Sequence, residues 1–455
     1  MPTKLERIKP FIQANILKGH GRNFANFIFL RFKDKAVREI RKKIRDLAES
    51  GITSSKIQED RASQYKKTRT VNLDKTESKS IGQDSTVSFM LTALGFEQLE
   101  LTSQLPKDEA FRQGMKGRKS ILKDNHRYWD GYPLAERFFG EISALIMVAN
   151  DAQDILERET GKLISDWSPY LAARPFVEKG AHLKKQFPGS DQAIPTDVFG
   201  FADGLSQPDV STLENAREVV LHEETTKGQY GSFLVFRKFQ QHLDRFDRLV
   251  SRLVEELNPS VPYPREFIEA QIMGRFKNGT PLNLSEKALP ASHNWKDVDF
   301  DYQLDRLGLK CPFHAHVRKM NPRSGEFNQL KRRIIRRSIA YDHGPFDRQQ
   351  RFGGRGLFFI AYQKSIAGQF EYLHELGNDT TTRTDDGREI PAGPDLIVNY
   401  QKNVNPNAGI PPRWNRDWGN DASAAEAHPA SLRDAIDLRG GAYFYVPSLP
   451  FLRNL

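Results

Sequence analysis

The chain has 455 residues, and its composition excludes several classes of protein. Hydrophobic residues make up 38% and aromatic residues 11%, which is enough to build a buried core and excludes a globally disordered chain. At roughly 100–200 residues per domain, a division into two large domains is the simplest expectation. Cys311 is the only cysteine, so no disulfide framework can form within the chain.

The charge balance is basic but dispersed. The 68 Lys and Arg outnumber the 58 Asp and Glu, giving a formal net charge of +10. The densest basic cluster, residues 331–337 (KRRIIRR), has two isoleucines at its centre, which is typical of a segment with one buried side. The cluster is compatible with a solvated face, an internal site for an anion or cofactor, or a nucleic-acid contact. Because the charges are interspersed along the chain, we expect no nucleic-acid partner.

The N-terminal segment gives no sign of export or membrane insertion. Residues 1–22 lack the apolar core of a secretory signal. No apolar run approaches the about 20 residues that are needed to span a bilayer. We therefore expect a cytoplasmic protein with no membrane partner.

The first predicted elements are a strand and a helix. Residues 27–30 (FIFL) form a short apolar run of strand length, and apolar residues then recur at helical spacing over residues 37–47. Residues 52–85 are polar with little periodicity, which predicts a long surface excursion. This excursion leads into a predicted strand at residues 87–91 (VSFML).

A similar pattern then returns further along the chain. Residues 145–148 (LIMV) predict a buried strand, and Asn150 or Asp151 can cap the helix that follows. Residues 233–236 (FLVF) predict a strand that is followed by an amphipathic helix over residues 246–257.

Two later strands complete the pattern. Residues 357–362 (LFFIAY) predict a core strand. Residues 442–446 (AYFYV) predict another strand, which we expect Gly440 and Gly441 to introduce and Pro447 to end.

The duplicated pattern predicts the fold class. Each half of the chain shows strand, helix, strand and strand, with the helices segregated from the strands, which favours an α+β fold made of two ferredoxin-like domains rather than one doubly wound sheet. We expect the N-terminal domain to span residues 1–222 and the C-terminal domain to span residues 223–455.

The first candidate for chemistry is residues 198–208, where Asp203 lies between glycines and aromatic residues. Asp203 and Gly204 can simply form a tight turn, with the carboxylate bonded to its own backbone and the glycine at positive φ. Alternatively, Asp203 is an acid whose proton affinity is set by its apolar neighbours.

The second candidate is residues 311–323, which hold His314 and His316 on one face of a predicted strand. Together with Cys311 the two histidines could bind zinc, but a structural zinc site needs four donors and the chain has no second cysteine, which disfavours zinc. A single axial imidazole on a haem iron needs one histidine, which this segment provides. A partly buried polar histidine is the remaining alternative.

Two further segments carry arginine beside apolar residues. One is the basic cluster at residues 331–337, and the other begins at Arg355 and continues into the apolar run of residues 357–362. Arginine keeps its charge when buried, so a guanidinium here can stabilise a developing anion. The second segment is equally compatible with an ordinary core strand.

Taken together and in order, these segments resemble the dye-decolorizing peroxidase family over nearly the whole chain. The matching blocks are residues 12–22 (IQANILKGHGR), 200–204 (GFADG), 315–318 (AHVR) with 321–323 (NPR), 335–338 (IRRS), 356–359 (GLFF) and 440–447 (GGAYFYVP).

The resemblance implies a fold of dimeric α+β barrel type and a cofactor, haem b (iron protoporphyrin IX), held mainly by the C-terminal domain. By matching positions, His316 resembles the axial ligand of the haem iron and Asp203 the distal acid–base residue. Arg336 resembles the distal arginine, and Leu357 and Phe359 part of the distal wall.

The implied activity is the reduction of hydrogen peroxide coupled to one-electron oxidation of bulky aromatic substrates such as dyes and phenols. The chain is then expected to act as a monomer or homo-oligomer. A haem-binding or haem-handling protein with little peroxide turnover is the alternative.

The sequence departs from the family pattern at three places, one of which is Met320. Residues 338–342 (SIAYD) replace a family motif that follows the distal arginine, which leaves the choice between Arg336 and Arg337 open. His314 stands where the family pattern has a small residue. Asp395 is a candidate partner for the second ring nitrogen of His316.

Overall fold

The computed structural model describes most of the chain. The described residues are 2–71, 84–124, 142–190, 193–257, 264–290, 300–321, 323, 329–345, 353–379, 381–383, 389–398, 413–415, 417–420, 425–426 and 435–455. Residues 72–83 of the predicted surface excursion and Pro322 of the matching block lie outside the described residues.

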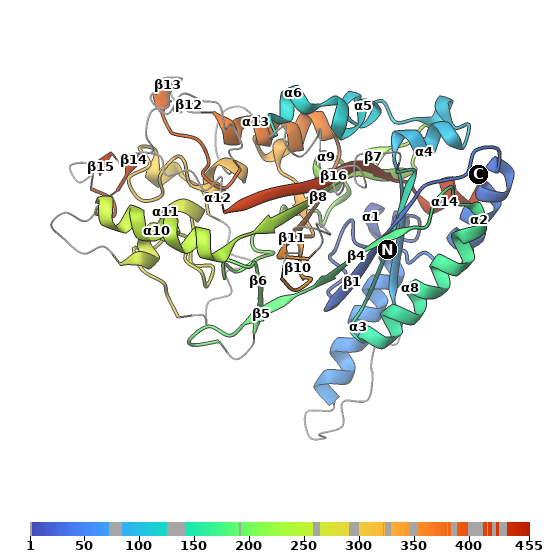
Figure 1. Ribbon diagram of the computed structural model, residues 1–455, viewed down its shortest axis with the longest axis horizontal. Coiled ribbons are helices and arrows are strands. Elements are labelled where there is room, and N and C mark those ends of the chain that lie inside the picture. Colours follow the sequence, from blue (N-terminus) through green and yellow to red (C-terminus); the bar gives the residue numbers. More distant parts are fainter. Residues whose placement is uncertain are drawn as a thin grey trace.

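Two antiparallel groups of strands, one from each half of the chain, form the centre of the molecule (Figure 1). The strand order is β10-β11-β8-β16 in one group and β2-β3-β1-β4 in the other. Their bounds are β1 (Phe24–Leu30), β2 (Thr86–Leu91), β3 (Ala144–Asn150), β4 (Phe176–Ala181), β8 (Tyr230–Gln241), β10 (Ile339–Asp342), β11 (Arg355–Gln363) and β16 (Ile436–Val446).

The two groups meet along both of their edges. At one edge β16 pairs with β2 through Tyr445 and Leu91. At the other edge β4 lies against β10, where a Cβ atom on Gly180 would approach Ile339 to 2.8 Å. The groups therefore enclose a common core.

Aromatic side chains from both groups fill this core. Phe27 of β1 packs edge-on against Phe236 of β8 and Phe358 of β11, with ring centroids 5.2 and 5.5 Å apart. Apolar burial of this kind stabilises a fold by roughly 25 cal/mol per Å². The strands of the two halves therefore depend on each other for their packing.

Helices cover the outer faces of the strands. α2 (Val37–Ser50) and α8 (Gln153–Trp167) lie on the N-terminal half, on the right of Figure 1. α10 (Leu243–Leu257), α11 (Arg265–Met273), α12 (His316–Met320) and α13 (Tyr372–Asn378) lie with the C-terminal half. Strands with helices on their outer faces confirm the predicted α+β fold class.

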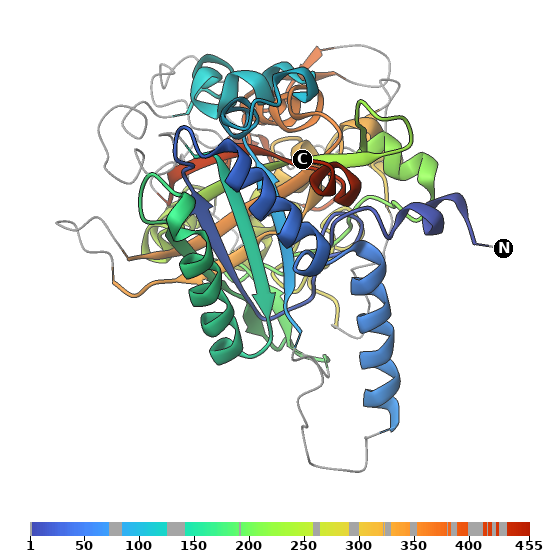
Figure 2. The same ribbon diagram turned by 90° about the vertical axis from the view of Figure 1, so that its right-hand side faces the viewer.

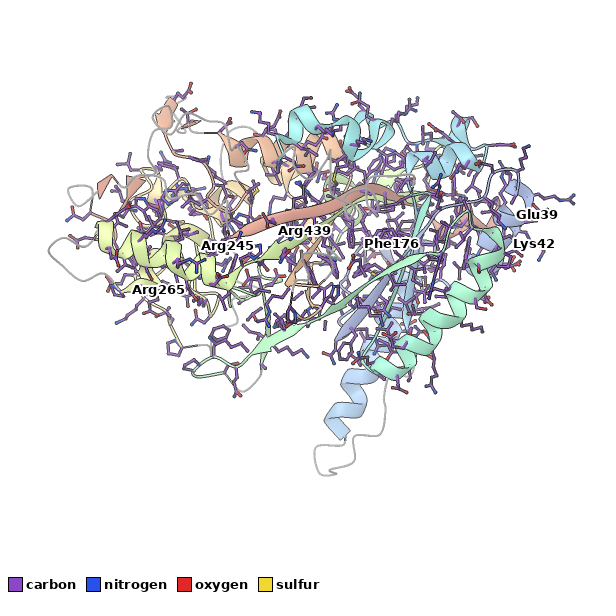
Figure 3. All side chains as sticks on the ribbon, viewed as in Figure 1. Glu39, Lys42, Phe176, Arg245, Arg265 and Arg439 are labelled. Atoms are coloured by element: carbon purple, nitrogen blue, oxygen red, sulfur yellow. The ribbon has the colours of Figure 1, made fainter. Side chains whose placement is uncertain are left out.

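The apolar runs identify strands and helices well. The predicted strands at residues 27–30, 87–91, 145–148, 233–236 and 357–362 lie within β1, β2, β3, β8 and β11. The predicted amphipathic helices are α2 and α10. Side chains also divide as expected: Glu39 and Lys42 point outward from α2, whereas Phe176 stacks on Phe29 with centroids 4.5 Å apart (Figure 3).

The prediction of an irregular excursion over residues 52–85 is wrong for its first part, because α3 (Ser55–Val71) is a helix. α3 projects away from the body of the protein, so it needs no apolar stripe (Figure 2). Local contacts stabilise it instead, including the ion pair at 2.6 Å between Lys56 and Asp60, one turn apart.

Two predictions of element ends are also wrong. The residue that caps α8 is Ala152, whose own N–H donates to the Asn150 side chain at 2.8 Å. Gly440 and Gly441 do not introduce the last strand but lie inside β16, where the register shifts between Leu438 and Gly440. A glycine at φ +142° accommodates this bulge.

Among the described residues, we find no helix that combines the length and the apolar character needed to cross a membrane.

Candidate active site

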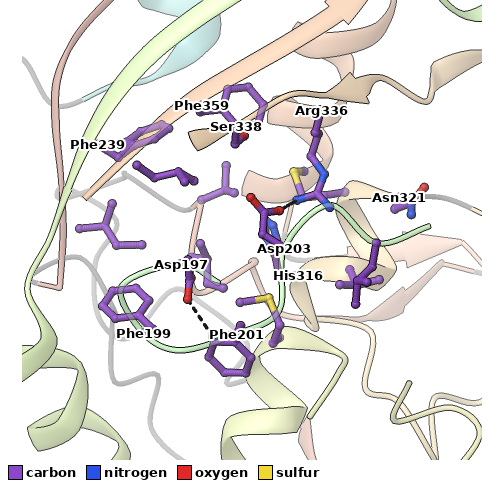
Figure 4. A pocket seen from close by; sticks show the side chains of 18 of the residues that line it. Asp197, Phe199, Phe201, Asp203, Phe239, His316, Asn321, Arg336, Ser338 and Phe359 are labelled. Carbon is purple, nitrogen blue, oxygen red and sulfur yellow. Dashed lines mark hydrogen bonds and ion pairs between the residues drawn. The ribbon is translucent and has the colours of Figure 1, made fainter. Parts of the chain in front are cut away.

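A large pocket lies against the outer face of β8 and β11. Its empty space is about 1420 Å³ including the mouth. The five site residues predicted from the sequence all line it, and Figure 4 labels four of them: Asp203, His316, Arg336 and Phe359; Leu357 is the fifth. The fold therefore brings together residues that are as far apart in the chain as Asp203 and Phe359.

Asp203 lies at the end of a short hairpin loop. Thr196 and Ala202 form a β-bridge, and the Asp203 N–H donates to Pro195 O at 3.0 Å. The Asp203 carboxylate accepts from the Gly204 N–H at 2.7 Å, and Gly204 has φ +75°. The two sequence interpretations are thus compatible, since the turn is what holds the carboxylate at the pocket wall.

Arg336 ends β9 (Ile335–Arg336), which pairs with β11. Its Nη1 lies 3.4 Å from Asp203 Oδ1, and its N–H donates to Gln207 Oε1 at 2.9 Å. The acid and the guanidinium therefore form one polar group in the pocket (Figure 4).

Arg337 points elsewhere. Its guanidinium donates to the carbonyl oxygens of Asn15, Ile16 and Leu17 in the N-terminal segment. Burial lowers the pKa of Arg337 to about 10. Adjacent residues of an extended chain face opposite sides, so only one of the two arginines can reach the pocket, and Arg336 is the one that does.

His316 begins α12, so the prediction that it lies on a strand is wrong. The preceding residues form a turn that ends at Ala315, where the helix starts. His316 Nδ1 lies 2.7 Å from Asp395 Oδ2, and Asp395 is fully buried. The expected contact with Asp395 is therefore present, and it leaves Nε2 as the ring nitrogen that is available to a ligand.

His314 does not share a face with His316. It is fully buried, and its ring packs against Trp414 with centroids 4.8 Å apart. Burial lowers the pKa of His314 to about 3, so the imidazole is neutral. His314 is a core residue outside the pocket lining.

β11 contributes to two environments at once. Leu357 and Phe359 line the pocket, whereas the alternate residues Phe358 and Ile360 lie in the core between the strand groups. Phe370, from the π-helix η6 (Ile366–Glu371), extends the apolar wall. The two alternatives for residues 357–362 are therefore both correct, since β11 is a core strand on one face and a pocket wall on the other.

Four ionisable residues of the pocket escaped the sequence prediction: Asp197, Arg237, Arg275 and His374. Asp197 opens the loop that ends at Asp203, and burial raises its pKa to about 7. The sequence contains a signal for Asp197, because this residue directly precedes the aromatic segment at residues 198–208. Arg275 follows α11 and donates to Ser206 Oγ at 2.8 Å, but no local motif marks it.

Two family models match the chain. The "DyP dimeric alpha+beta barrel domain" matches residues 11–173, and "Dyp-type peroxidase, C-terminal" matches residues 194–257 and 267–389. The chain belongs to the dye-decolorizing (DyP-type) peroxidase family. As a member of this family, it is a haem-dependent peroxidase.

Individual members are similar over most of their length. The multifunctional dye peroxidase DyP2 of Amycolatopsis sp. is 28% identical and covers 98% of this chain and 95% of its own. Dye-decolorizing peroxidase msp1 of Mycetinis scorodonius is 28% identical over 81% of this chain and 76% of its own. The crystal structure of a DyP-type peroxidase from Anabaena sp. has a TM-score of 0.79 and 29% identity, covering 98% and 94%.

The residues of the pocket fit a haem. Its lining is mostly apolar, as a porphyrin requires, with Phe, Leu, Ile, Val and Met side chains from several elements. The His316 ring is oriented by a buried carboxylate at Nδ1, which is the usual arrangement of a metal-binding histidine. Arg275 and Arg336 supply positive charge for acidic substituents.

Proposed function

We propose that this chain uses haem b to reduce hydrogen peroxide and to oxidise bulky aromatic compounds, including dyes and phenols, in one-electron steps. The observation that carries the proposal is the convergence of His316, Asp203 and Arg336 on one apolar pocket. The names of its relatives DyP2 and msp1 support dyes as substrates.

We assign the iron-binding role to His316. When bound, the haem supplies an iron that takes up peroxide and exchanges electrons. His316 would ligate it through Nε2, while Asp395 accepts the proton of Nδ1 and keeps the ring in this tautomer. Arg275 would pair with the carboxylate side chains that haem b carries.

We assign the proton transfer to Asp203. Peroxide must lose a proton from one oxygen, and the other oxygen must gain a proton to leave as water. A carboxylate within hydrogen-bond reach can perform both transfers. The carboxylate of Asp203 is held by the Gly204 N–H, so it takes and returns the proton without moving the loop.

Arg336 stabilises the negative charge that develops on the departing oxygen. Its guanidinium already lies 3.4 Å from Asp203, so no solvent has to reorganise during the reaction. A donor of this kind typically contributes about 3–4 kcal/mol. Leu357 and Phe359 keep water away from the same region and strengthen this interaction.

Two further expectations stay proposals. We place the domain boundary between residues 222 and 223, within the short strand β7 (His222–Glu223), which pairs with β8. We also expect the protein to work in the cytoplasm.

Absorption spectroscopy and stopped-flow kinetics test the assignments. The purified protein should show the Soret band of ferric haem, and His316→Ala should lose or shift it. His242→Ala is a matched control, because His242 also pairs with an aspartate, Asp437, at 3.0 Å but lies outside the pocket lining. Asp203→Asn should keep the Soret band and slow the reaction with peroxide. An unchanged spectrum in His316→Ala, or unchanged peroxide kinetics in Asp203→Asn, would contradict the respective role.

A further inference from the structure

Asp197 is a second carboxyl group of the pocket, and the proposed mechanism gives it no role. Asp197 lies at the start of the loop that ends at Asp203 (Figure 4). Its N–H donates to Phe201 O at 3.0 Å, and its C=O accepts from the Gly200 N–H at 3.1 Å. Its side-chain Oδ1 accepts from the Phe201 N–H at 2.9 Å. Asp197 therefore closes the turn from which the chain returns to Asp203.

The charged groups that share the pocket with Asp197 come from several elements. Asp203 belongs to the same loop, Arg237 to β8 and Arg336 to β9, and all three line the pocket. Lys277, whose backbone pairs with the loop at Ala202, forms an ion pair with Glu269 at 2.9 Å. Among the described residues, no cation forms an ion pair with Asp197 itself.

Without a cationic partner, Asp197 holds its proton to an unusually high pH. Burial raises its pKa to about 7, and the negative charge of Asp203 acts in the same direction. The hydrogen bond from the Phe201 N–H opposes this shift but does not cancel it. Asp197 thus changes its charge near neutrality, within the same pocket as Asp203.

Gln241 of β8 can serve both protonation states of Asp197. Its Nε2 lies 3.4 Å from Asp197 Oδ2, which suits the ionised carboxylate. Its Oε1 is buried and has no hydrogen-bond partner within the described part of the chain. Because the amide can turn by 180°, the neutral acid can donate its proton to that oxygen.

We propose that Asp197 is a positioning residue for Asp203, and that its proton decides whether the pocket holds one carboxylate or two. This inference rests on the proposed role of Asp203. With Asp197 neutral, Asp203 is the single carboxylate and peroxide loses its proton to it. With Asp197 ionised, a second negative charge opposes the negative charge that develops on peroxide. The reaction with peroxide therefore slows as the pH rises through neutrality.

The test is Asp197→Asn, an isosteric change that keeps an acceptor for the Phe201 N–H. The second-order rate constant with hydrogen peroxide is measured by stopped flow across the pH range. In the wild type it should fall by about tenfold between about pH 5 and about pH 9, which corresponds to one pKa unit of interaction between the two carboxyl groups. In Asp197→Asn this fall should be lost. An equal fall in both proteins overturns the proposal.

A second readout does not depend on activity. Infrared difference spectra between acidic and alkaline pH should show a protonated-carboxyl band that titrates near neutrality and is missing in Asp197→Asn. If that band persists in the variant, the group that titrates is not Asp197. Because this readout involves no peroxide, a wild-type protein that fails to react with peroxide would contradict the proposed function without deciding the state of Asp197.

Two other variants complete the design. Asp209→Asn is the matched control, since Asp209 is an exposed aspartate outside the pocket, and it should keep the wild-type pH dependence. Gln241→Leu replaces the amide whose hydrogen bond lowers the pKa of Asp197 with an apolar side chain, and apolar surroundings favour the neutral acid over the carboxylate. It should therefore move the inflection and the infrared titration to higher pH. This variant decides the proposal if Asp197→Asn does not fold, and an unmoved inflection would overturn it.

Discussion

The hydrogen bond between His316 and Asp395 leads to a quantitative prediction for the rate at which the Asp395→Asn variant loses haem. Asp395 Oδ1 accepts from the Ile397 N–H at 2.8 Å and from the Val398 N–H at 3.3 Å, while Oδ2 accepts from His316. An asparagine at this position keeps its oxygen on the two backbone donors. Its amide N–H₂ group then faces His316, which must present an unprotonated Nδ1 to accept from it.

This change reverses the tautomer of the imidazole. With Nδ1 unprotonated, the proton of the neutral ring lies on Nε2, the nitrogen proposed to bind iron. A hydrogen bond to a charged group contributes roughly 1.5–3 kcal/mol, and each 1.4 kcal/mol corresponds to about a tenfold change in an equilibrium constant. We therefore expect haem to leave Asp395→Asn about 10- to 100-fold faster, in line with the usual effect of such partners.

Transfer of haem to an excess of apomyoglobin, followed by absorbance, measures this rate. Glu375→Gln is the control, because Glu375 is an exposed carboxylate on the neighbouring helix α13. Haem loss from Asp395→Asn at the rate of the wild type and of this control would refute the argument about the tautomer.

Two predictions concern stability. Glu371 is buried and accepts from Arg118 at 2.6 Å and from the Tyr443 hydroxyl at 3.1 Å, so Glu371→Gln should lower the free energy of unfolding by about 3–5 kcal/mol. Lys238 and Glu178 form a buried ion pair at 2.8 Å between β8 and β4. Lys238→Met alone should destabilise the protein similarly, whereas adding Glu178→Leu should restore most of the loss. Denaturant unfolding followed by circular dichroism measures both, and a double variant no more stable than Lys238→Met would contradict the second prediction.

The sequence predicts elements where burial dominates their pattern. The runs at residues 145–148 and 233–236 are apolar throughout because β3 and β8 are covered on both faces. α3 was missed for the opposite reason, since a helix that leaves the body carries no apolar stripe. Hydrophobic periodicity therefore identifies the elements that pack against the core, and it misses a helix that projects away from the body of the protein.

The sequence likewise predicts some residues of the site and misses others. Resemblance identifies Asp203, His316 and Arg336 because each stands in a block of recognisable residues. The sequence could not choose between Arg336 and Arg337, since both are arginines and only the direction of β9 decides which faces the pocket. Arg275 was missed because it reaches the pocket through tertiary packing alone.

The two faces of β8 connect the site to the fold. Phe236 and Lys238 point into the core shared by the two halves, where Lys238 meets Glu178 of β4. Arg237 and Phe239, the residues in alternation with them, line the pocket. Because successive side chains of a strand point to opposite faces, a shift of β8 relative to the core would move the pocket wall by the same amount. Closure of the two strand groups thus fixes the wall against which a haem would rest.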